Sequence, residues 1–260
     1  MKTTPAISCV IPVFNGKRDL QRAVGSVLAQ RPDVEVVLVD DGSTDGSGEH
    51  VLQLARDDRR VVALLLPESR GQGNARNIGV AAANSSYVTF LDQDDEHIPG
   101  WYDYAVEFLD NNAGHAAIKG GVELMDVPAD LTIEPADPRL PAIGNSVMWN
   151  VVLRKVVYQA LGGCPTSRHY GEDVAFMSVL NRHSPPVATD YPSTQHYVRP
   201  SGSTARFLRR TRVVGTRFEF LETHSVEVNG TLAKALQDFE AQADINVRAL
   251  HALLKTAQGE

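Results

Sequence analysis

The amino-acid sequence predicts an α/β protein built on an open, mostly parallel sheet that is flanked by helices. Over the first 110 residues, short runs of branched apolar residues alternate with longer segments of helical period. The strand-like runs are apolar almost throughout, which is typical of parallel strands covered on both faces. Sheets of this kind place ligands at the carboxyl ends of their strands, so we expect the functional residues there.

The expected elements follow one another closely. Strands are expected at residues 7–13, 34–39, 61–66 and 87–91, and helices at residues 18–30, 49–55 and 75–83. Prolines between residues 126 and 141 predict a long surface loop or a boundary, and a second proline-rich stretch, 185–200, is read as a loop as well. Between them we expect a strand and then a helix in 146–158, and a helix in 174–180. Residues 231–254 have heptad-like apolar spacing, which predicts a further helix.

Composition excludes several classes of protein. With 25 basic and 32 acidic residues, the net charge of −7 argues against general electrostatic binding to nucleic acid. No apolar run approaches the roughly 18 residues of a membrane span, and we expect no secretion signal. Cys9 and Cys164 are expected to be buried free thiols in a reducing cytoplasm, with a single disulfide as the alternative.

Acidic residues follow two of the expected strands. Asp92 and Asp94 would leave on one side if the extended conformation continued, and such a pair favours Mg²⁺ or Mn²⁺ over a merely solvated acidic turn. Asp40 and Asp41 begin a segment like a calcium loop, but its twelfth position is Leu52 rather than Glu. That segment is better interpreted as a strand–turn–helix corner with a bend at Gly42 and a helix cap at Ser43, Thr44 or Asp45.

Two further motifs lie at expected helix starts. Residues 71–76 begin like a dinucleotide fingerprint, but Arg76 stands at the third glycine position, so we expect no nicotinamide or flavin. An arginine in a first helical turn can still meet a phosphate or a ribose. Glu172 and Asp173 precede an apolar helix, where the helix dipole stabilises negative charge. The nearby His169, His183 and His196 lack the spacing of a metal site.

Taken together, these motifs closely resemble the family 2 glycosyltransferases of the GT-A fold, over about residues 6–205. The resemblance is carried by residues 11–15 (IPVFN), 39–47 (VDDGSTDGS), 75–79 (ARNIG), 90–95 (FLDQDD) and 171–173 (GED). It implies an inverting transfer of a sugar, by default from a UDP-sugar, to the hydroxyl of a saccharide or lipid-linked acceptor. A guanosine or thymidine donor stays open.

The resemblance also implies roles for individual residues. Asp173 would be the catalytic base and Glu172 its neighbour, which positions the sugar or the acceptor. Asp94, with Asp92, would hold the Mn²⁺ or Mg²⁺ that bridges the donor phosphates, with the ribose as the alternative partner of Asp92. The donor-binding residues would be Pro12, Phe14, Asn15, Asp41, Arg76, Asp92, Gln93, Arg199 and Ser203.

The sequence departs from the family pattern after the base. Many relatives carry an Arg-x-His-x-x-Ser type loop near the donor phosphates, but Pro200 stands at the expected histidine position. Arg199 and Ser203 could serve this loop. His196 is a weak candidate for a third metal ligand.

We therefore expect a donor-binding half at 1–110, an acceptor-binding half at 111–204 and a helical tail at 205–260. Five arginines between Arg206 and Arg217 would form either a solvated basic face or a contact with phosphate head groups. The tail helix would pack on its own domain or pair with a second copy, with Asn246 setting the register. We expect a cytoplasmic protein, or one peripheral to the inner membrane face.

Two rival functions remain at this point. A sugar-1-phosphate nucleotidyltransferase would need a Gly-rich, Arg-containing loop after the first strand, where residues 12–16 (PVFNG) stand instead. A non-catalytic nucleotide-sugar-binding or assembly subunit is disfavoured because Asp94 and Asp173 are both present.

Overall fold

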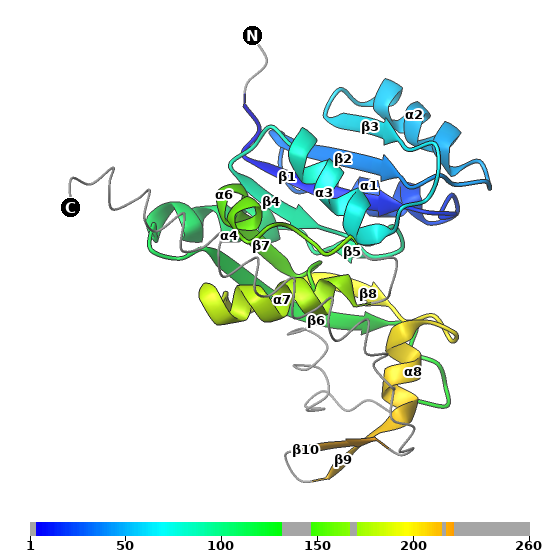
Figure 1. Cartoon of the computed structure of the whole chain (residues 1–260), viewed down its shortest axis with the longest axis vertical. Coiled ribbons are helices and arrows are strands. Elements are labelled where there is room, and N and C mark those ends of the chain that lie inside the picture. Colours follow the sequence, from blue (N-terminus) through cyan, green and yellow to red (C-terminus); the bar gives the residue numbers. More distant parts are fainter. Residues whose placement is uncertain (1–3, 132–146, 167–170, 215–216, 221–260) are drawn as a thin grey trace.

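A computed structural model describes residues 4–131, 147–166, 171–214 and 217–220. Its centre is one large sheet with the strand order β3-β2-β1-β4-β7-β6-β8-β5. Neighbours among β1, β2, β3 and β4 are parallel, and so are β6 and β8, whereas β7 runs antiparallel to both β4 and β6. Figure 1 shows this sheet running through the molecule with helices packed against it.

The elements of the first half are β1 (Ile7–Val13), α1 (Leu20–Leu28), β2 (Val34–Asp40), α2 (Ser47–Asp57), β3 (Val61–Leu65), α3 (Gln72–Ala82), β4 (Tyr87–Phe90), β5 (Glu96–His97) and α4 (Trp101–Asn111). The strands and helices expected up to residue 91 are therefore confirmed, with ends that shift by a few residues. Sequence patterning gave no expectation for β5 and α4.

The two faces of the sheet carry separate apolar clusters. Alternate residues of β1 point to opposite faces: Cys9 and Ile11 pack with α1, α2 and α4, whereas Val10 packs with α3, α6 and α7. Both clusters are almost fully excluded from water, which explains the unbroken apolar runs. Cys9 and Cys164 are free and buried, and burial raises the pKa of their thiols to about 12 and about 11.

The second half contains β6 (Ala117–Met125), β7 (Val151–Arg154), α6 (Lys155–Ala160), α7 (Glu172–His183) and β8 (Val187–Tyr197). The strand and helix expected in 146–158 are β7 and α6. The loop expected at 185–200 is wrong, because most of it is β8. Pro192 stands opposite Gly121, where the register between β6 and β8 shifts, and an irregular pairing of this kind tolerates a residue without an N–H.

The chain continues into α8 (Ser203–Arg210), β9 (Thr211–Val214) and β10 (Arg217–Phe220), and the last two form an antiparallel hairpin. The expected helical tail, 205–260, is helical through Arg210 at the end of α8, and the strands β9 and β10 follow it. The heptad-like helix expected at 231–254 and the dimer contact assigned to it lie outside the described residues. Among the helices that the structure describes, none combines the length and apolarity needed to cross a membrane.

Candidate active site

The loops that follow β1, β2, β3 and β4 meet at the carboxyl edge of the parallel strands. Gln93 joins the first loop to the fourth, because its side-chain amide accepts a hydrogen bond from Phe14 N (2.9 Å) and donates one to Phe14 O (3.0 Å). Asn15 joins the first to the second, since its N–H donates to Ser43 Oγ and its Oδ1 accepts from Thr44 N, both at 2.9 Å. Asn15 has a φ of 49°, a conformation that asparagine adopts more readily than most residues. The Phe14 ring remains 49% exposed beside these contacts, whereas Pro12 is buried within β1.

Asp41 shapes the loop that precedes α3. It follows β2, is 4% exposed, and accepts hydrogen bonds from Ser69 Oγ (2.7 Å), Arg70 N (2.9 Å) and Gly71 N (2.9 Å). Gly42 takes a φ of 74°, as expected for the bend. The N-cap residue of α2 is Gly46 and not one of the three expected cap residues, although Asp45 just before it accepts from Ser47 N at 3.0 Å and so satisfies a backbone donor in the first turn.

Arg76 connects two acidic segments that are far apart in the sequence. Its guanidinium donates to Asp92 Oδ1 at 3.1 Å and to Glu172 Oε1 at 2.7 Å, while its side chain is only 2% exposed. Burial works against the charge of Arg76, but the nearby carboxylates outweigh it and raise the pKa. The Arg76 Nε atom is buried without a hydrogen-bond partner among the described residues. Arg76 therefore brings the end of β4 against the first turn of α7.

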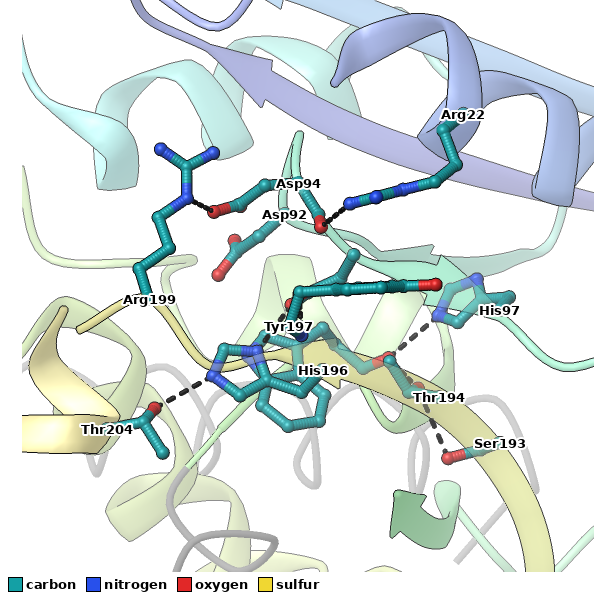
Figure 2. A network of polar contacts seen from close by, with 12 residues as sticks. Arg22, Asp92, Asp94, His97, Ser193, Thr194, His196, Tyr197, Arg199 and Thr204 are labelled. Atoms are coloured by element: carbon teal, nitrogen blue, oxygen red, sulfur yellow. Dashed lines mark hydrogen bonds and ion pairs between the residues drawn. The ribbon is translucent and has the colours of Figure 1, made fainter. Parts of the chain in front are cut away.

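Asp92 and Asp94 lie together because the chain turns, not because the strand continues. β4 ends at Phe90, and Asp95 N donates to Asp92 O at 3.1 Å across the turn. Figure 2 shows the carboxylates of Asp92 and Asp94 next to each other. Burial, followed by the charge of Asp92, raises the pKa of Asp94. The strand thus does not continue in the extended conformation past Phe90, and the turn brings the two side chains together instead.

Two arginines hold Asp94 from opposite sides (Figure 2). Arg199 Nε lies 2.7 Å from Asp94 Oδ2, and Arg22 donates to the backbone oxygen of Asp94 at 2.6 Å. Arg22 also stacks its guanidinium over the Tyr197 ring, 3.8 Å from the centroid, and pairs with Glu96 at 3.2 Å. The loop is thus held by α1 on one side and by the segment after β8 on the other. Ser203 is the first residue of α8, four residues beyond Arg199.

Both ring nitrogens of His196 are already engaged by protein groups. Its Nδ1 lies 2.8 Å from Asp95 Oδ2 and its Nε2 2.8 Å from Thr204 Oγ1, and its ring stacks on Trp149 (Figure 2). Burial raises the pKa of Asp95, and the neighbouring His196 opposes this shift. Burial also works against the positive charge of His196, but the hydrogen bond and the charge of Asp95 outweigh burial and raise the pKa of His196. Sequence reasoning missed this pair. The only signal was a third acidic residue in the run 92–95 (DQDD).

Asp173 lies in the first turn of α7, next to Glu172. Its Oδ1 accepts a hydrogen bond from Val174 N at 2.8 Å. Burial raises the pKa of Asp173 to about 6, Arg76 lowers it, and Glu172 raises it. Glu172 is instead committed to Arg76. The two neighbouring carboxylates therefore differ in what they can do: Asp173 can take up a proton near neutral pH, and Glu172 positions Arg76.

The chain is similar to known glycosyltransferases. The sequence profile of the family described as "Glycosyl transferase family 2" matches residues 8–126. An uncharacterized glycosyltransferase of Haemophilus influenzae is 41% identical over 92 residues, which are 35% of this chain and 37% of that protein. The putative teichuronic acid biosynthesis glycosyltransferase TuaG of Bacillus subtilis is 35% identical over 106 residues, 40% of this chain and 42% of that protein.

The fold is similar to that of solved structures as well. The structure of Staphylococcus aureus TarS 1–349 in complex with UDP-GlcNAc superposes with a TM-score of 0.63 at 18% identity, covering 77% of this chain and 60% of that one. The complex of the same protein with UDP gives a TM-score of 0.61 at 19% identity, covering 75% and 61%. The chain matches less than half the length of the curated relatives named here. The profile match over residues 8–126, the relatives and the GT-A fold agree, and together they support a glycosyltransferase similar to glycosyl transferase family 2.

Proposed function

We propose that the chain catalyses the inverting transfer of a sugar from a nucleoside diphosphate donor to an acceptor hydroxyl, assisted by a divalent cation. One observation carries the proposal: Arg76 joins Asp92 to Glu172, so the acidic loop after β4 and the first turn of α7 face one place. A cation site and a base on two different elements are what a displacement needs, because the leaving group and the attacking hydroxyl lie on opposite sides of the sugar carbon. The similarity to glycosyl transferase family 2 supports this reading.

The acidic loop suits Mn²⁺ or Mg²⁺ in its donor chemistry. The contacts of the described residues use Oδ1 of Asp92 and Oδ2 of Asp94, so the other oxygen of each carboxylate is available. No group of three or more His, Cys, Asp or Glu side chains surrounds a metal position in the described part of the chain. Asp92 and Asp94 would therefore share the cation with donor phosphates and water. A bound cation supplies positive charge where the leaving diphosphate gains negative charge.

Asp173 is the proposed base. Among the contacts of the described residues, one oxygen of Asp173 is committed, to the backbone of α7, and its raised pKa, about 6, suits proton transfer near neutral pH. Glu172 is tied to Arg76, so it is not a second base or a nucleophile. One free carboxylate supports a single displacement, and a single displacement inverts the anomeric configuration.

The donor nucleotide is proposed to bind over the loops after β1 and β2. The exposed Phe14 ring can stack on a base, and Asn15 and Asp41 shape the loops around it. Arg76 is too buried to reach far into this space, so we assign it to positioning. A UDP-sugar is the first choice because the similar TarS structures contain UDP and UDP-GlcNAc.

The acceptor is proposed to be a cell-surface saccharide or its lipid-linked precursor, by analogy with TuaG, whose name places it in teichuronic acid biosynthesis. Residues 111–204 would bind it, since this half supplies Asp173. The arginines after residue 205, which would make a peripheral membrane contact, include Arg209, whose guanidinium is paired with Asp130 at 2.8 Å and donates to Pro200 O at 2.6 Å.

Calorimetric and thermal-shift titrations with UDP, GDP and TDP test the proposal, each with Mn²⁺, with Mg²⁺ and with chelator. We expect one nucleotide to bind in a metal-dependent manner, and Asp94→Asn to remove the metal dependence. Asp57→Asn is the matched control, because it makes the same change on the exposed face of α2. If no nucleotide binds under any metal, the donor assignment fails and the assembly-subunit alternative gains. If a nucleoside triphosphate and a sugar phosphate release pyrophosphate, the protein is a nucleotidyltransferase instead.

A further inference from the structure

Arg199 pairs with the carboxylate of Asp94, which the proposed function assigns to a cation. Its Nε lies 2.7 Å from Asp94 Oδ2, and a terminal nitrogen of the same guanidinium lies 2.8 Å from Asp19 Oδ2, just before α1. The guanidinium thus spans two carboxylates, of which Asp94 is the one that the proposed function assigns to a divalent cation. Figure 2 shows Arg199 reaching Asp94 from the segment that follows β8.

Several contacts fix the backbone that precedes Arg199, whereas the guanidinium of Arg199 remains partly exposed to solvent. Tyr197 N donates to Asp95 Oδ1 at 3.0 Å and Tyr197 Oη to Glu96 at 2.6 Å, and His196 pairs with Asp95. The Arg199 side chain is nevertheless 51% exposed. An ion pair with one exposed partner contributes little stability, so it can be exchanged for another partner at small cost. Arg199 therefore combines a fixed anchor with an exchangeable guanidinium.

The surrounding charges explain why the pair forms. Asp94 lies near Asp92 and Asp95, and carboxylates this close together need a positive neighbour. Arg22 meets only the backbone oxygen of Asp94. Among the described residues, Arg199 is thus the cation that contacts the Asp94 carboxylate. A divalent cation on Asp94 would stand beside Arg199, and like charges at such a distance repel.

We infer that Arg199 is a tethered counter-ion, which holds Asp94 in the free protein and moves to the donor diphosphate when a divalent cation binds Asp94. The inference rests on the proposed function, because it takes Asp94 as a cation ligand. It has a thermodynamic consequence. The free protein binds the cation weakly, and the cation and the nucleotide assist each other's binding, because the diphosphate draws Arg199 away from Asp94.

The experiment measures Mn²⁺ binding by electron paramagnetic resonance and UDP binding by calorimetry. Without nucleotide, Arg199→Gln is expected to tighten Mn²⁺ binding about three- to tenfold, because a competing charge is removed. At saturating Mn²⁺ the same variant is expected to bind UDP at least about threefold more weakly, because the diphosphate loses a charged partner. Arg199→Lys keeps the charge and should retain Mn²⁺ affinity near that of the wild type. Arg56→Gln, an equal charge change on an exposed residue of α2, should alter neither affinity.

The test is that Arg199→Gln changes the affinities for Mn²⁺ and for UDP in opposite directions. A merely structural role of Arg199 would weaken both affinities together. Unchanged Mn²⁺ affinity in Arg199→Gln, or a loss of both affinities, overturns the counter-ion proposal. Asp94→Asn separates this failure from a failure of the proposed function. If Asp94→Asn loses Mn²⁺ while Arg199→Gln binds it as the wild type does, only the counter-ion proposal falls. If Asp94→Asn keeps Mn²⁺ affinity, the cation assignment falls as well.

Discussion

Replacing Glu172 by Gln tests how the first turn of α7 sets the proton affinity of Asp173. Glu172 raises the pKa of Asp173, whereas Arg76 lowers it. Glu172→Gln keeps the shape of the side chain and removes its negative charge. The change also leaves the charge of Arg76 less neutralised. Both effects favour ionised Asp173, so its pKa is expected to fall.

The size of this shift follows from the separation of the two carboxylates. Neighbouring side chains on one helical turn place unit charges about 7 Å apart, and at an effective dielectric constant of about 40 to 80 they interact by about 0.6 to 1.2 kcal/mol. This corresponds to roughly half to nearly one pKa unit. The wild-type midpoint should lie near 6, and that of the variant clearly below it.

The Val174 amide provides a readout that needs no knowledge of the acceptor. Its N–H donates to Asp173 Oδ1 at 2.8 Å, so its chemical shift should follow the protonation of Asp173 in a pH titration by NMR. Glu107→Gln, on the exposed face of α4, controls for the change in net charge. A wild-type midpoint near the ordinary aspartate value of 3.8 would refute the burial argument. A midpoint that rises in Glu172→Gln would refute the proposed electrostatics of the turn.

Three further variants have expected outcomes. Asp173→Asn should lower turnover about 10²- to 10⁴-fold. Folding raises the pKa of Asp173 from 3.8 to about 6, so ionisation of Asp173 opposes folding. Asp173→Asn should therefore be more stable than the wild type by up to about 3 kcal/mol above pH 6, and this difference should disappear toward pH 3.8. Denaturant unfolding at a series of pH values measures the difference. Asp41→Asn should lose about 1–3 kcal/mol of stability and weaken nucleotide binding, because Gly71 N and its neighbours lose a charged acceptor, and unchanged thermal unfolding would contradict this. Gly79→Ala should lose about 1–3 kcal/mol in chemical denaturation, since a Cβ there would collide with Val10 where α3 packs on β1, whereas wild-type stability would show that the helix can shift.

The parallel half of the sheet was predictable because its physical signal is local. Each strand is a short apolar run that both faces bury, and each helix has its own periodicity. β8 was not predictable in this way. The prolines in and around β8 indicate a loop, and only the pairing of Pro192 opposite Gly121, in an irregular part of the β6–β8 ladder, makes a strand possible there. The pairing depends on residues 71 positions apart, which no local pattern contains.

The candidate site likewise has a part that local sequence predicts and a part that depends on distant contacts. The acidic and glycine-rich loops could be placed at strand ends from the sequence, because glycine and aspartate favour turns wherever they follow an apolar strand. Their mutual contacts could not. Gln93 joins two loops through both atoms of its amide, and Asp95 pairs with His196 from the far half of the chain. Arg76 resembled a nucleotide contact in sequence, but the fold buries it between Asp92 and Glu172.

This burial of Arg76 gives the site a property that none of its motifs has alone. A buried guanidinium that loses one of two carboxylates is left with uncompensated charge, which is costly in a poorly solvated position. Anything that draws Asp92 toward a bound cation therefore makes Arg76 depend more strongly on Glu172, and so holds the first turn of α7 more tightly. Arg76 also lowers the pKa of Asp173, which makes the same turn sensitive to where the guanidinium lies. The chain thus contains a direct physical route by which cation binding at the end of β4 can position and tune the proposed base on α7. Asp92→Asn should accordingly shift the Val174 titration even though Asp92 makes no hydrogen bond to α7.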